Sequence, residues 1–369
     1  MVRVCYVVLS PTFGMQQYTA SLANQLTGAF ASESGQKWQT TVITNHQVPR
    51  DRYAPQVDVR PVVNIAGTGL QRTNFNVLGV EAVYRAIRAA QPDVVHFTGP
   101  HIWNPALLLR LKQAGLKTIH TIHDLDPHSG AGYGQLLYVW NNSILRWADH
   151  ILVHGRVYQK RLTHKGMPDL KVTYTPLLHL FLSYTAEAEL RQMQPAGAME
   201  SYILFFARIE AYKGVDLLCE AMSQLQGSND MRAIVAGKGD LELVTPPNVE
   251  IRNRLLGDAE AIDLFSHCRL VVLPYRDATQ SALIGAAYFF SKPVIVTRTG
   301  ALPEYVKDGT TGWIIEPGSA AALAERLSAA TGDPAQLQQM GQAGRAWYEE
   351  HYREENSTLR RMYERVVCT

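Results

Sequence analysis

Cysteine is scarce in this sequence, and no two cysteines stand close together along the chain. Four occur among 369 residues, and no Cys-x-x-Cys pair is present. This spacing excludes a compact disulfide framework and favours a reducing compartment. We therefore expect all four, Cys5, Cys219, Cys268 and Cys368, to be small apolar side chains inside the core.

Long apolar segments are missing as well. No run approaches the ~20 residues that a membrane-spanning helix requires, and residues 281–290 are among the longest. Residues 1–9 start directly in a strand-like pattern, without the basic, apolar and small-residue regions of a secretion signal. We expect a soluble, cytoplasmic protein, and peripheral contact with the inner face of the membrane remains open.

An excess of charge of one sign is also absent. Lys and Arg number 35 against 33 Asp and Glu, so the formal net charge is +2 and no nucleic-acid partner is expected. The balance is uneven, since residues 1–180 carry 17 basic and 9 acidic side chains and residues 181–369 carry 18 and 24. Different partners for the two halves, or attraction between the halves, are both open explanations.

What the sequence does contain is apolar material for a core, at 46% hydrophobic residues, in alternating strand-like and helix-like segments. Strand-like runs occur at 2–9, 40–44, 93–97, 117–122, 150–154 and 171–174, and again at 202–207, 231–236, 249–252, 270–273 and 293–297. Helical patterns lie between them, for example at 17–26, 78–90, 106–114, 136–147, 215–225 and 259–267. The alternation predicts an α/β protein with parallel sheets covered on both faces.

One segment, residues 176–201, interrupts the alternation. It contains Pro176, an apolar stretch at 177–182 and a Pro-Ala-Gly-Ala sequence, and it is typical of a connection between domains. We predict a first Rossmann-like domain over residues 1–180 and a second over residues 181–342. The apolar stretch is expected to be a buried linker, with membrane contact as the alternative.

Candidate binding residues follow the predicted strands. After the first strand, Gly14 and Met15 open a helix, where a glycine lets a ligand approach the backbone and the helix N-terminus offers unpaired N–H groups. No Gly-x-Gly-x-x-Gly pattern is present, which disfavours a dinucleotide site. An ordinary strand-to-helix turn remains open here.

Several histidines gather in residues 118–128, a pattern that raises the question of a metal site. Because successive side chains of a strand point to opposite faces, His120 and His123 should diverge, with His120 in the core. His123 ends the strand and Asp124 begins the loop, at the edge where open parallel sheets bind ligands. We predict His123 as a hydrogen-bonding or acid–base group rather than a metal ligand, and the place of His96 stays open.

Two turns in the second half have groups suited to phosphate. Arg208 and Lys213 flank the turn after the first strand of that half, beside a helix N-terminus, where two cations suit a diphosphate. In the turn after its fourth strand, Thr279 or Ser281 is placed to cap the next helix, whose amides suit a further phosphate. Surface cations and a plain N-cap are the alternatives, but two such turns favour a nucleoside diphosphate.

Together these residues resemble the family-4 glycosyltransferases, which adopt the GT-B architecture of two Rossmann-like domains with an interdomain cleft. The matching motifs are Phe-Gly-Met at 13–15, His-Asp at 123–124, Arg208 with Lys213-Gly214, Ala-Gly-Lys-Gly at 236–239, and a long pattern from Val272 to Gly312 that includes Thr-Gln-Ser at 279–281. The order and spacing of these motifs together are specific, and they extend over most of the chain.

The resemblance implies a nucleotide-sugar site that lies mostly on the second domain. The residues it implies in catalysis are His123, which would face the sugar and the acceptor, and Arg208 and Lys213, which would hold the diphosphate. The residues it implies in donor binding are Gly14, Met15, Arg208, Lys213, Gly237, Arg254, Leu255, Leu256, Asp277, Thr279, Gln280 and Ser281, with 251–256 framing the nucleobase. The last helices, 343–369, are expected to cross back onto the first domain.

The chain departs from the family pattern at one point. Two glutamates eight residues apart are usual, the first near the donor sugar and the second on the ribose, and Ala278 and Ala286 stand at those positions. Asp277 is one residue from the first of them. The sequence instead resembles a branch of the family with a Thr-Gln-Ser turn, and Met15 stands where a second glycine is usual.

The reaction that the resemblance implies is transfer of a sugar from a UDP- or GDP-type donor to an acceptor hydroxyl, with retention, in polysaccharide or glycolipid assembly. The acceptor is a saccharide or a lipid-linked saccharide. No metal and no bound cofactor are expected, because fixed cations and helix amides suit the leaving diphosphate. A catalytically impaired homologue that binds sugar nucleotide or scaffolds a polysaccharide-assembly complex is the alternative, and a nucleotide-sugar epimerase is a third.

Overall fold

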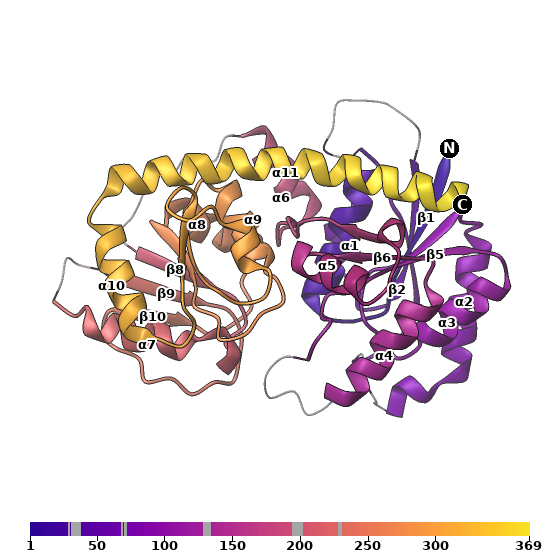
Figure 1. Cartoon of the computed structure of the whole chain (residues 1–369), viewed down its shortest axis with the longest axis horizontal. Helices are drawn as coiled ribbons and strands as arrows, with labels where there is room; N and C mark the ends of the chain where they lie inside the picture. Colours follow the sequence, from indigo (N-terminus) through magenta and orange to yellow (C-terminus); the bar gives the residue numbers. More distant parts are fainter. Residues whose placement is uncertain are drawn as a thin grey trace.

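Two parallel sheets, each covered by helices, form the framework of the computed structural model, which describes residues 1–28, 30, 38–67, 69, 72–127, 134–193, 202–227 and 231–369. The two sheet-and-helix bodies lie side by side, and the long helix α11 (Pro334–Cys368) lies along both (Figure 1). This confirms the predicted α/β architecture with two Rossmann-like domains.

The first sheet has seven parallel strands in the order β3-β2-β1-β4-β5-β6-β7. They are β1 (Val2–Val8), β2 (Trp38–Asn45), β3 (Asp58–Val63), β4 (Val94–Phe97), β5 (Lys117–Thr121), β6 (His150–Val153) and β7 (Val172–Tyr174). The connecting helices are α1 (Phe13–Leu26), α2 (Val77–Ala89), α3 (Asn104–Gln113), α4 (Gly134–Trp147) and α5 (Arg156–His164), with short 3₁₀ turns η1 (Arg50–Arg52), η2 (Arg72–Phe75) and η3 (Asp169–Lys171). Because helices cover both faces, β4 and β6 are buried at every position.

The second sheet has six parallel strands in the order β10-β9-β8-β11-β12-β13. They are β8 (Tyr202–Phe206), β9 (Arg232–Ala236), β10 (Val249–Arg252), β11 (Leu270–Leu273), β12 (Val294–Thr297) and β13 (Gly312–Ile315). The helices are α6 (Tyr184–Gln192), α7 (Val215–Gln224), α8 (Asp258–His267), α9 (Ala282–Phe289) and α10 (Ala320–Thr331), with η4 (Ala211–Lys213) and η5 (Leu302–Tyr305). Every residue of α9 is buried, so this helix forms the inner layer of the second domain.

Both sheets reverse their strand order at the first strand of each domain. β1 lies between β2 and β4, and β8 lies between β9 and β11. In open parallel sheets the loops on either side of such a point diverge at the carboxyl edge, which is where ligands bind. The loops after β1, β8 and β11 leave the sheets at these two points, and the loop after β5 leaves the same edge of the first sheet.

The connection between the domains is buried where the structure describes it. Leu178, Leu180 and Leu182 are all buried, and Gln17 Nε2 donates to the carbonyl oxygens of Leu180 and Leu182 over 2.8 Å each. This confirms the buried linker that was predicted at 177–182. The end of the predicted connection, residues 194–201, lies outside the described residues.

The long helix α11 begins on the second domain and ends on the first, as the sequence predicted for 343–369. Its last turns join the first-domain core through Leu359, Met362, Tyr363 and Val366. It starts at Pro334 rather than near 343, because Asp333 accepts from the Gln336 N–H over 2.9 Å and caps the helix there.

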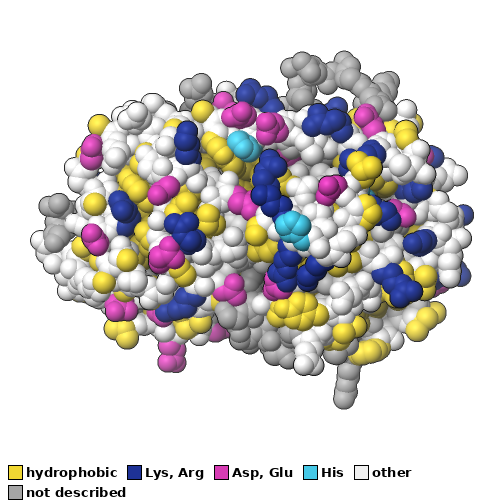
Figure 2. All heavy atoms as spheres, in the orientation of Figure 1, with side chains coloured by type: hydrophobic (Ala, Val, Ile, Leu, Met, Phe, Trp, Pro, Cys, Tyr) yellow, Lys and Arg dark blue, Asp and Glu magenta, His cyan; other side chains and the backbone are white. Residues whose placement is uncertain are grey.

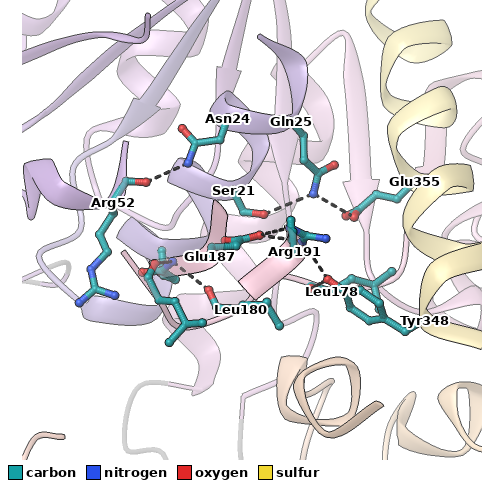
Figure 3. A network of polar contacts seen from close by, with 12 residues as sticks. Ser21, Asn24, Gln25, Arg52, Leu178, Leu180, Glu187, Arg191, Tyr348 and Glu355 are labelled. Atoms are coloured by element: carbon teal, nitrogen blue, oxygen red, sulfur yellow. Dashed lines mark hydrogen bonds and ion pairs between the residues drawn. The ribbon is translucent and has the colours of Figure 1, made fainter. Parts of the chain in front are cut away.

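Side-chain contacts between α6, α1 and α11 also connect the two domains (Figure 3). Arg191 pairs with Glu187 on α6 and donates to Tyr348 Oη on α11 over 3.0 Å. Farther along α11, Glu355 accepts from Gln25 Nε2 over 3.3 Å. The crossing of α11 is therefore anchored by buried polar contacts as well as by apolar packing.

Several elements were not among those named from the sequence, including β3, β13, α5, α6 (Tyr184–Gln192) and α10 (Ala320–Thr331). The edge strand β3 contains Pro61, which is tolerated only at an edge or a bulge and weakens the strand pattern. The strand β13 has four residues, and α5 carries mostly polar side chains. Cys368 was expected inside the core and is exposed at the end of α11, whereas the other three cysteines are buried.

The surface carries both signs of charge on each domain. On the face drawn in Figure 2, basic and acidic side chains are interspersed over the two bodies, so the positive balance of the first half does not gather there into one patch. Within the described ranges, no helix combines the length and the apolar character needed to span a bilayer.

Candidate functional site

The predicted site loops meet where the two domains touch. Thr279, in the loop after β11, donates from Oγ1 to Asp124 Oδ1 in the loop after β5 over 2.6 Å. Tyr158 of α5 donates from its hydroxyl to the Thr279 carbonyl oxygen over 3.4 Å. Residues that stand 155 positions apart in the chain therefore share one site.

Lys213 lies against aromatic rings just before α7. Its Nζ is 3.8 Å from the ring centroid of Tyr275 and 5.0 Å from that of Tyr212. Loss of solvent around the amino group, and then the positive charge of Arg208, lower the pKa of Lys213 to about 7. An anionic ligand that approached this amine would restore its full charge.

Arg208 stands beside Lys213 at the end of β8 and is held in place by two neighbours. Its Nη1 pairs with the carboxylate of Glu210, and its Nη2 donates to Tyr212 Oη over 3.0 Å. The guanidinium is thus fixed in direction while its side chain stays largely exposed to solvent. Arg208 and Lys213 together form a cationic corner, and their role in holding a diphosphate stays a prediction.

The two phosphate-suited turns are in backbone contact with each other. Gly214 has φ +67°, and a Cβ at this position would lie 2.0 Å from the carbonyl oxygen of Pro274. Only glycine fits such a left-handed and crowded position. The turn after β8 therefore lies against the turn after β11.

The turn that leads into α9 differs from its prediction in one respect. Ser281 is the N-cap residue of α9, yet no side chain caps the helix, because Thr279 directs its hydroxyl to Asp124 instead. The predicted capping role is therefore wrong for Thr279 and for Ser281. The first-turn amides of α9 carry the positive end of the helix dipole without a side-chain cap.

His123 is buried at the end of β5 beside this turn. Its Nε2 lies 2.9 Å from the carbonyl oxygen of Thr98, which places the proton on Nε2 and leaves Nδ1 as the acceptor. Burial lowers the pKa of His123, while the Thr98 bond and the charge of Asp124 oppose the shift. The side chain is suited to accept a hydrogen bond in its neutral form.

The other two histidines of the sequence prediction belong to the core. His120 is bound by Asn104 and lies with Nδ1 2.7 Å from the Thr121 carbonyl oxygen, so its expected core place is confirmed. His96, whose place was open, is buried and bonds Tyr363 of α11 through Nδ1 over 2.7 Å. Among the residues that the structure describes, no three His, Cys, Asp or Glu side chains stand close enough to hold a metal ion.

The loops after β8, β9 and β10 contact one another beside the cationic corner. A Cβ on Gly237 would lie 1.8 Å from the Ala207 carbonyl oxygen, so only glycine fits there. Asn253 accepts from the Gly239 N–H over 3.0 Å and donates to its carbonyl oxygen over 2.8 Å. Backbone groups that follow adjacent strands therefore converge here, and the predicted framing of a base by 251–256 stays a prediction.

Two side chains of that segment, Arg254 and Leu255, point away from the core. Arg254 pairs with Glu260 of α8, and Leu255 is 76% exposed, while Leu256 packs against the second-domain core. The side chains of Arg254 and Leu255 are thus free of the core, and any contact with a base would come through the backbone or this exposed surface.

The first predicted loop is open to solvent. A Cβ on Gly14 would meet nothing within 4 Å, so packing within the domain does not require glycine at this position. Its neighbour Met15 packs under Gly99, and Phe13 stacks on Phe181 of the connection with ring centroids 6.4 Å apart. The open backbone at Gly14 fits the expected approach of a ligand.

The two alanines that depart from the family pattern are buried. Ala278 is 4% exposed and Ala286 is 3% exposed. Ala286 belongs to an apolar surround formed with Leu180, Phe181 and Phe265. An apolar contact between α9 and the interdomain connection therefore occupies the place where the family pattern has its second glutamate.

Two functional candidates escaped prediction from the sequence. Glu304 of η5 accepts from the backbone N–H groups of Arg156 and Val157 over 2.6 and 2.8 Å, across the domain boundary. Tyr158, which lies on α5 with Arg156 and Val157, donates from its hydroxyl to the Thr279 carbonyl oxygen. Glu304 lies inside the family-like pattern from Val272 to Gly312, which was a signal for it, whereas α5 itself was not predicted.

Comparison with known families divides the chain at the same place as the structure. The family described as "Glycosyl transferase 4-like domain" matches residues 13–177, and the family described as "Glycosyl transferases group 1" matches residues 200–333.

Curated relatives are distant. GDP-mannose:glycolipid 4-beta-D-mannosyltransferase of Xanthomonas campestris pv. campestris is 24% identical over 220 residues, which are 56% of this chain and 58% of that enzyme. D-inositol 3-phosphate glycosyltransferase of Mycobacterium sp. (strain JLS) is 24% identical over 306 residues, 75% of this chain and 69% of that enzyme. The match thus spans little more than half the length of the mannosyltransferase.

Solved structures share the fold over the whole chain. Sucrose-phosphate synthase from Thermosynechococcus elongatus superimposes with a TM-score of 0.75 at 17% identity, with all of both chains covered. Anabaena Alr3699/HepE, in complex with UDP-glucose, does so with a TM-score of 0.72 at 15% identity, again with all of both chains covered. The two-domain arrangement is therefore the GT-B fold that the sequence resemblance implied.

Proposed function

Since its two domains belong to the glycosyl transferase 4-like and glycosyl transferases group 1 families, we propose that this chain moves a sugar from a UDP- or GDP-sugar to a hydroxyl group of a saccharide or a lipid-linked saccharide. The choice of bases follows the relatives, one named for GDP-mannose and one bound to UDP-glucose. Polysaccharide or glycolipid assembly is the process that this activity would serve.

The observation that carries the proposal is the cationic corner of Arg208 and Lys213 beside the uncapped N-terminus of α9. When the bond between sugar and diphosphate breaks, the diphosphate gains negative charge. Fixed cations and helix amides stabilise that charge most strongly where water is excluded. Lys213 meets this condition, because its amine is poorly solvated enough for its pKa to fall to about 7.

The proposed chemistry is a front-face transfer with retention. The anomeric carbon–oxygen bond breaks with its electron pair going to the diphosphate, the acceptor oxygen bonds to the same face, and the acceptor proton passes to the departing phosphate. His123 would hold a sugar hydroxyl through Nδ1. No metal is needed in this scheme, because Arg208 and Lys213 supply the positive charge.

The first test combines binding and turnover. A thermal-shift screen of UDP, GDP and their sugar conjugates should identify the base, since a ligand of the folded state raises Tm. The double substitution Arg208→Ala with Lys213→Ala should then lower turnover of the best donor by about 1,000-fold. Lys307→Ala, an exposed cation of the same domain, is the matched control. Near-normal turnover in the double variant would sink the diphosphate assignment.

Metal independence and retention need separate measurements. We expect full turnover in the presence of EDTA, and complete loss that Mg²⁺ or Mn²⁺ restores would contradict the metal-free scheme. We also expect NMR of the product to show the anomeric configuration of the donor. The Xanthomonas relative is named for a β-linked product, which makes this measurement decisive for the stereochemistry.

A second candidate function is a protein that binds sugar nucleotide without transferring it. The observation in its favour is the apolar packing around Ala286, which puts a buried methyl group where the family pattern has its second glutamate. Such a protein would show a thermal shift with a nucleotide sugar but neither hydrolysis nor transfer. Turnover of any donor in the screen decides between the two.

We also propose peripheral contact with an anionic membrane through the first domain. Large apolar side chains are exposed near the starts of α2 and α4, namely Phe75, Val77, Leu78, Leu136, Tyr138 and Val139. In a domain with more basic than acidic side chains, such a surface would bring the site to a lipid-linked acceptor. Cosedimentation with phosphatidylglycerol vesicles at low salt tests this, and Val77→Asp with Leu78→Asp should abolish it. Absence of wild-type binding at low salt would remove the proposal.

A further inference from the structure

Asp124 is an acidic side chain of the first domain that reaches the donor side of the site. Its Oδ1 accepts from Thr279 Oγ1 over 2.6 Å across the domain boundary. Its backbone is held from the other side, since Asn141 Nδ2 donates to the carbonyl oxygens of Asp124 and Leu125 over 3.0 and 3.1 Å. The carboxylate is therefore placed by the first domain and directed at the second.

The charge of Asp124 acts on the groups that form the cationic corner. Burial and Arg208 lower the pKa of Lys213, and the carboxylates of Glu210 and Asp124 oppose that shift. Burial raises the pKa of Tyr158 to about 12, and Asp124 adds to this rise. Asp124 is thus close enough to Lys213 and Tyr158 to act on both, and Asp126 and Asp277 act on Tyr158 as well.

The second domain has alanines at the two positions near the start of α9 where the family pattern has glutamates, and its Asp277 also raises the pKa of Tyr158. Positions 278 and 286 carry buried methyl groups. Asp277 stands before this turn, and its backbone N–H is directed to the Tyr212 carbonyl oxygen. The Thr279 hydroxyl, at the start of this turn, donates to Asp124 of the first domain.

We propose that Asp124 supplies the carboxylate that faces the reacting sugar; this rests on the proposed transferase function and deepens it. As the bond from the anomeric carbon to the diphosphate oxygen breaks, its electron pair leaves with the diphosphate and positive charge develops on the sugar. An ionised carboxylate beside the ring stabilises that charge. Asp124 forms no bond to the sugar and takes no proton, because the acceptor proton leaves with the phosphate.

This placement makes the carboxylate depend on domain closure. Asp124 reaches the donor turn only when the first domain rests on the second, so the charge that stabilises the sugar is in place only in the closed arrangement. The same charge lies near the diphosphate and repels it. Asp124 therefore weakens the binding of a nucleoside diphosphate while it speeds the transfer, and these opposite effects can be measured separately.

The test is Asp124→Asn, which keeps an oxygen to accept from Thr279 and removes the charge. We expect the kcat for the best UDP- or GDP-sugar to fall by about 100-fold, and the Kd for UDP or GDP alone to become about threefold smaller because the repulsion is gone. Asp124→Glu should restore part of kcat. Asp126→Asn is the control in the same loop, because the Asp126 carboxylate pairs with Arg161 and is expected to leave both constants unchanged.

The outcomes separate this inference from the function on which it rests. Wild-type protein that turns over no nucleotide sugar would overturn the proposed function and the role of Asp124 with it. Wild-type turnover that survives Asp124→Asn within about threefold would overturn the role of Asp124 alone. A parallel loss of binding, turnover and Tm would indicate a structural role and contradict the proposal. Asp124→Ala repeats the measurement if the amide variant does not fold.

Discussion

At the scale of the residue, Lys213 gives the site a dependence on pH. Its pKa is about 7 in the free protein, because the amine is poorly solvated and lies near Arg208. A bound diphosphate raises that pKa. Above pH 7 and below the new pKa, binding therefore takes up a proton, and affinity falls as pH rises.

We expect calorimetry at pH 8 to show uptake of about half a proton or more on binding of UDP or GDP. The measurement compares binding enthalpies in buffers of different ionisation enthalpy. Lys213→Arg should abolish the uptake, because a guanidinium stays charged at this pH. Equal uptake in the wild type and in Lys213→Arg would assign the proton to another group.

At the scale of the element, helix α5 starts without a cap from its own domain. Its N-cap residue is Gly155, which has no side chain to accept a hydrogen bond, and its first turn carries no acidic residue. Glu304 of the second domain accepts from Arg156 N–H and Val157 N–H instead. A capping interaction of this kind contributes about 1 kcal/mol, here to the contact between domains.

We expect Glu304→Ala to shift the two domains toward an open arrangement in the absence of ligand. Small-angle X-ray scattering should show a larger radius of gyration, while circular dichroism stays close to that of the wild type. Glu304→Gln should keep most of the closure, because the amide oxygen still accepts. An unchanged radius for Glu304→Ala would show that the cap does not hold the domains together.

The same elements show which parts of the structure can be predicted from the sequence and which cannot. The parallel sheets, the domain division and the loops after β1, β5, β8 and β11 follow from apolar periodicity and from residues adjacent in the chain. The contact between Asp124 and Thr279 does not, because a hydrogen bond between side chains 155 positions apart depends on how two domains rest on each other. The element α5 was missed because its stability comes from packing and from a cap on another domain, not from its own apolar pattern.

At the scale of the whole molecule, Glu355 of α11 contacts the first domain. Its contribution to the free energy of unfolding depends on pH. It is 3% exposed, and burial raises its pKa from 4.5 to about 8, against the hydrogen bond from Gln25 and the charge of Arg191 (Figure 3). The folded protein thus favours protonated Glu355. Its contribution to stability is complete below pH 4.5 and is lost as pH rises toward 8.

We expect Glu355→Gln to raise Tm by a few degrees at pH 9 and to change it little at pH 4.5. The amide mimics the protonated acid that the folded state prefers, so its advantage grows as the wild-type group ionises. Glu350→Gln, an exposed position on the same helix, should be neutral at both values. A pH-independent difference between Glu355→Gln and wild type in thermal unfolding would contradict this assignment.

The crossing of α11 has a consequence for the order of events during biosynthesis. The apolar cluster of the first sheet includes Leu359, Met362, Tyr363 and Val366, although every strand of that sheet lies before residue 175. A ribosome that has completed these strands has therefore not yet made part of their packing surface. The first domain therefore stays incompletely packed until the whole second domain has been translated. During this interval, chaperones that shield nascent apolar surface can bind it.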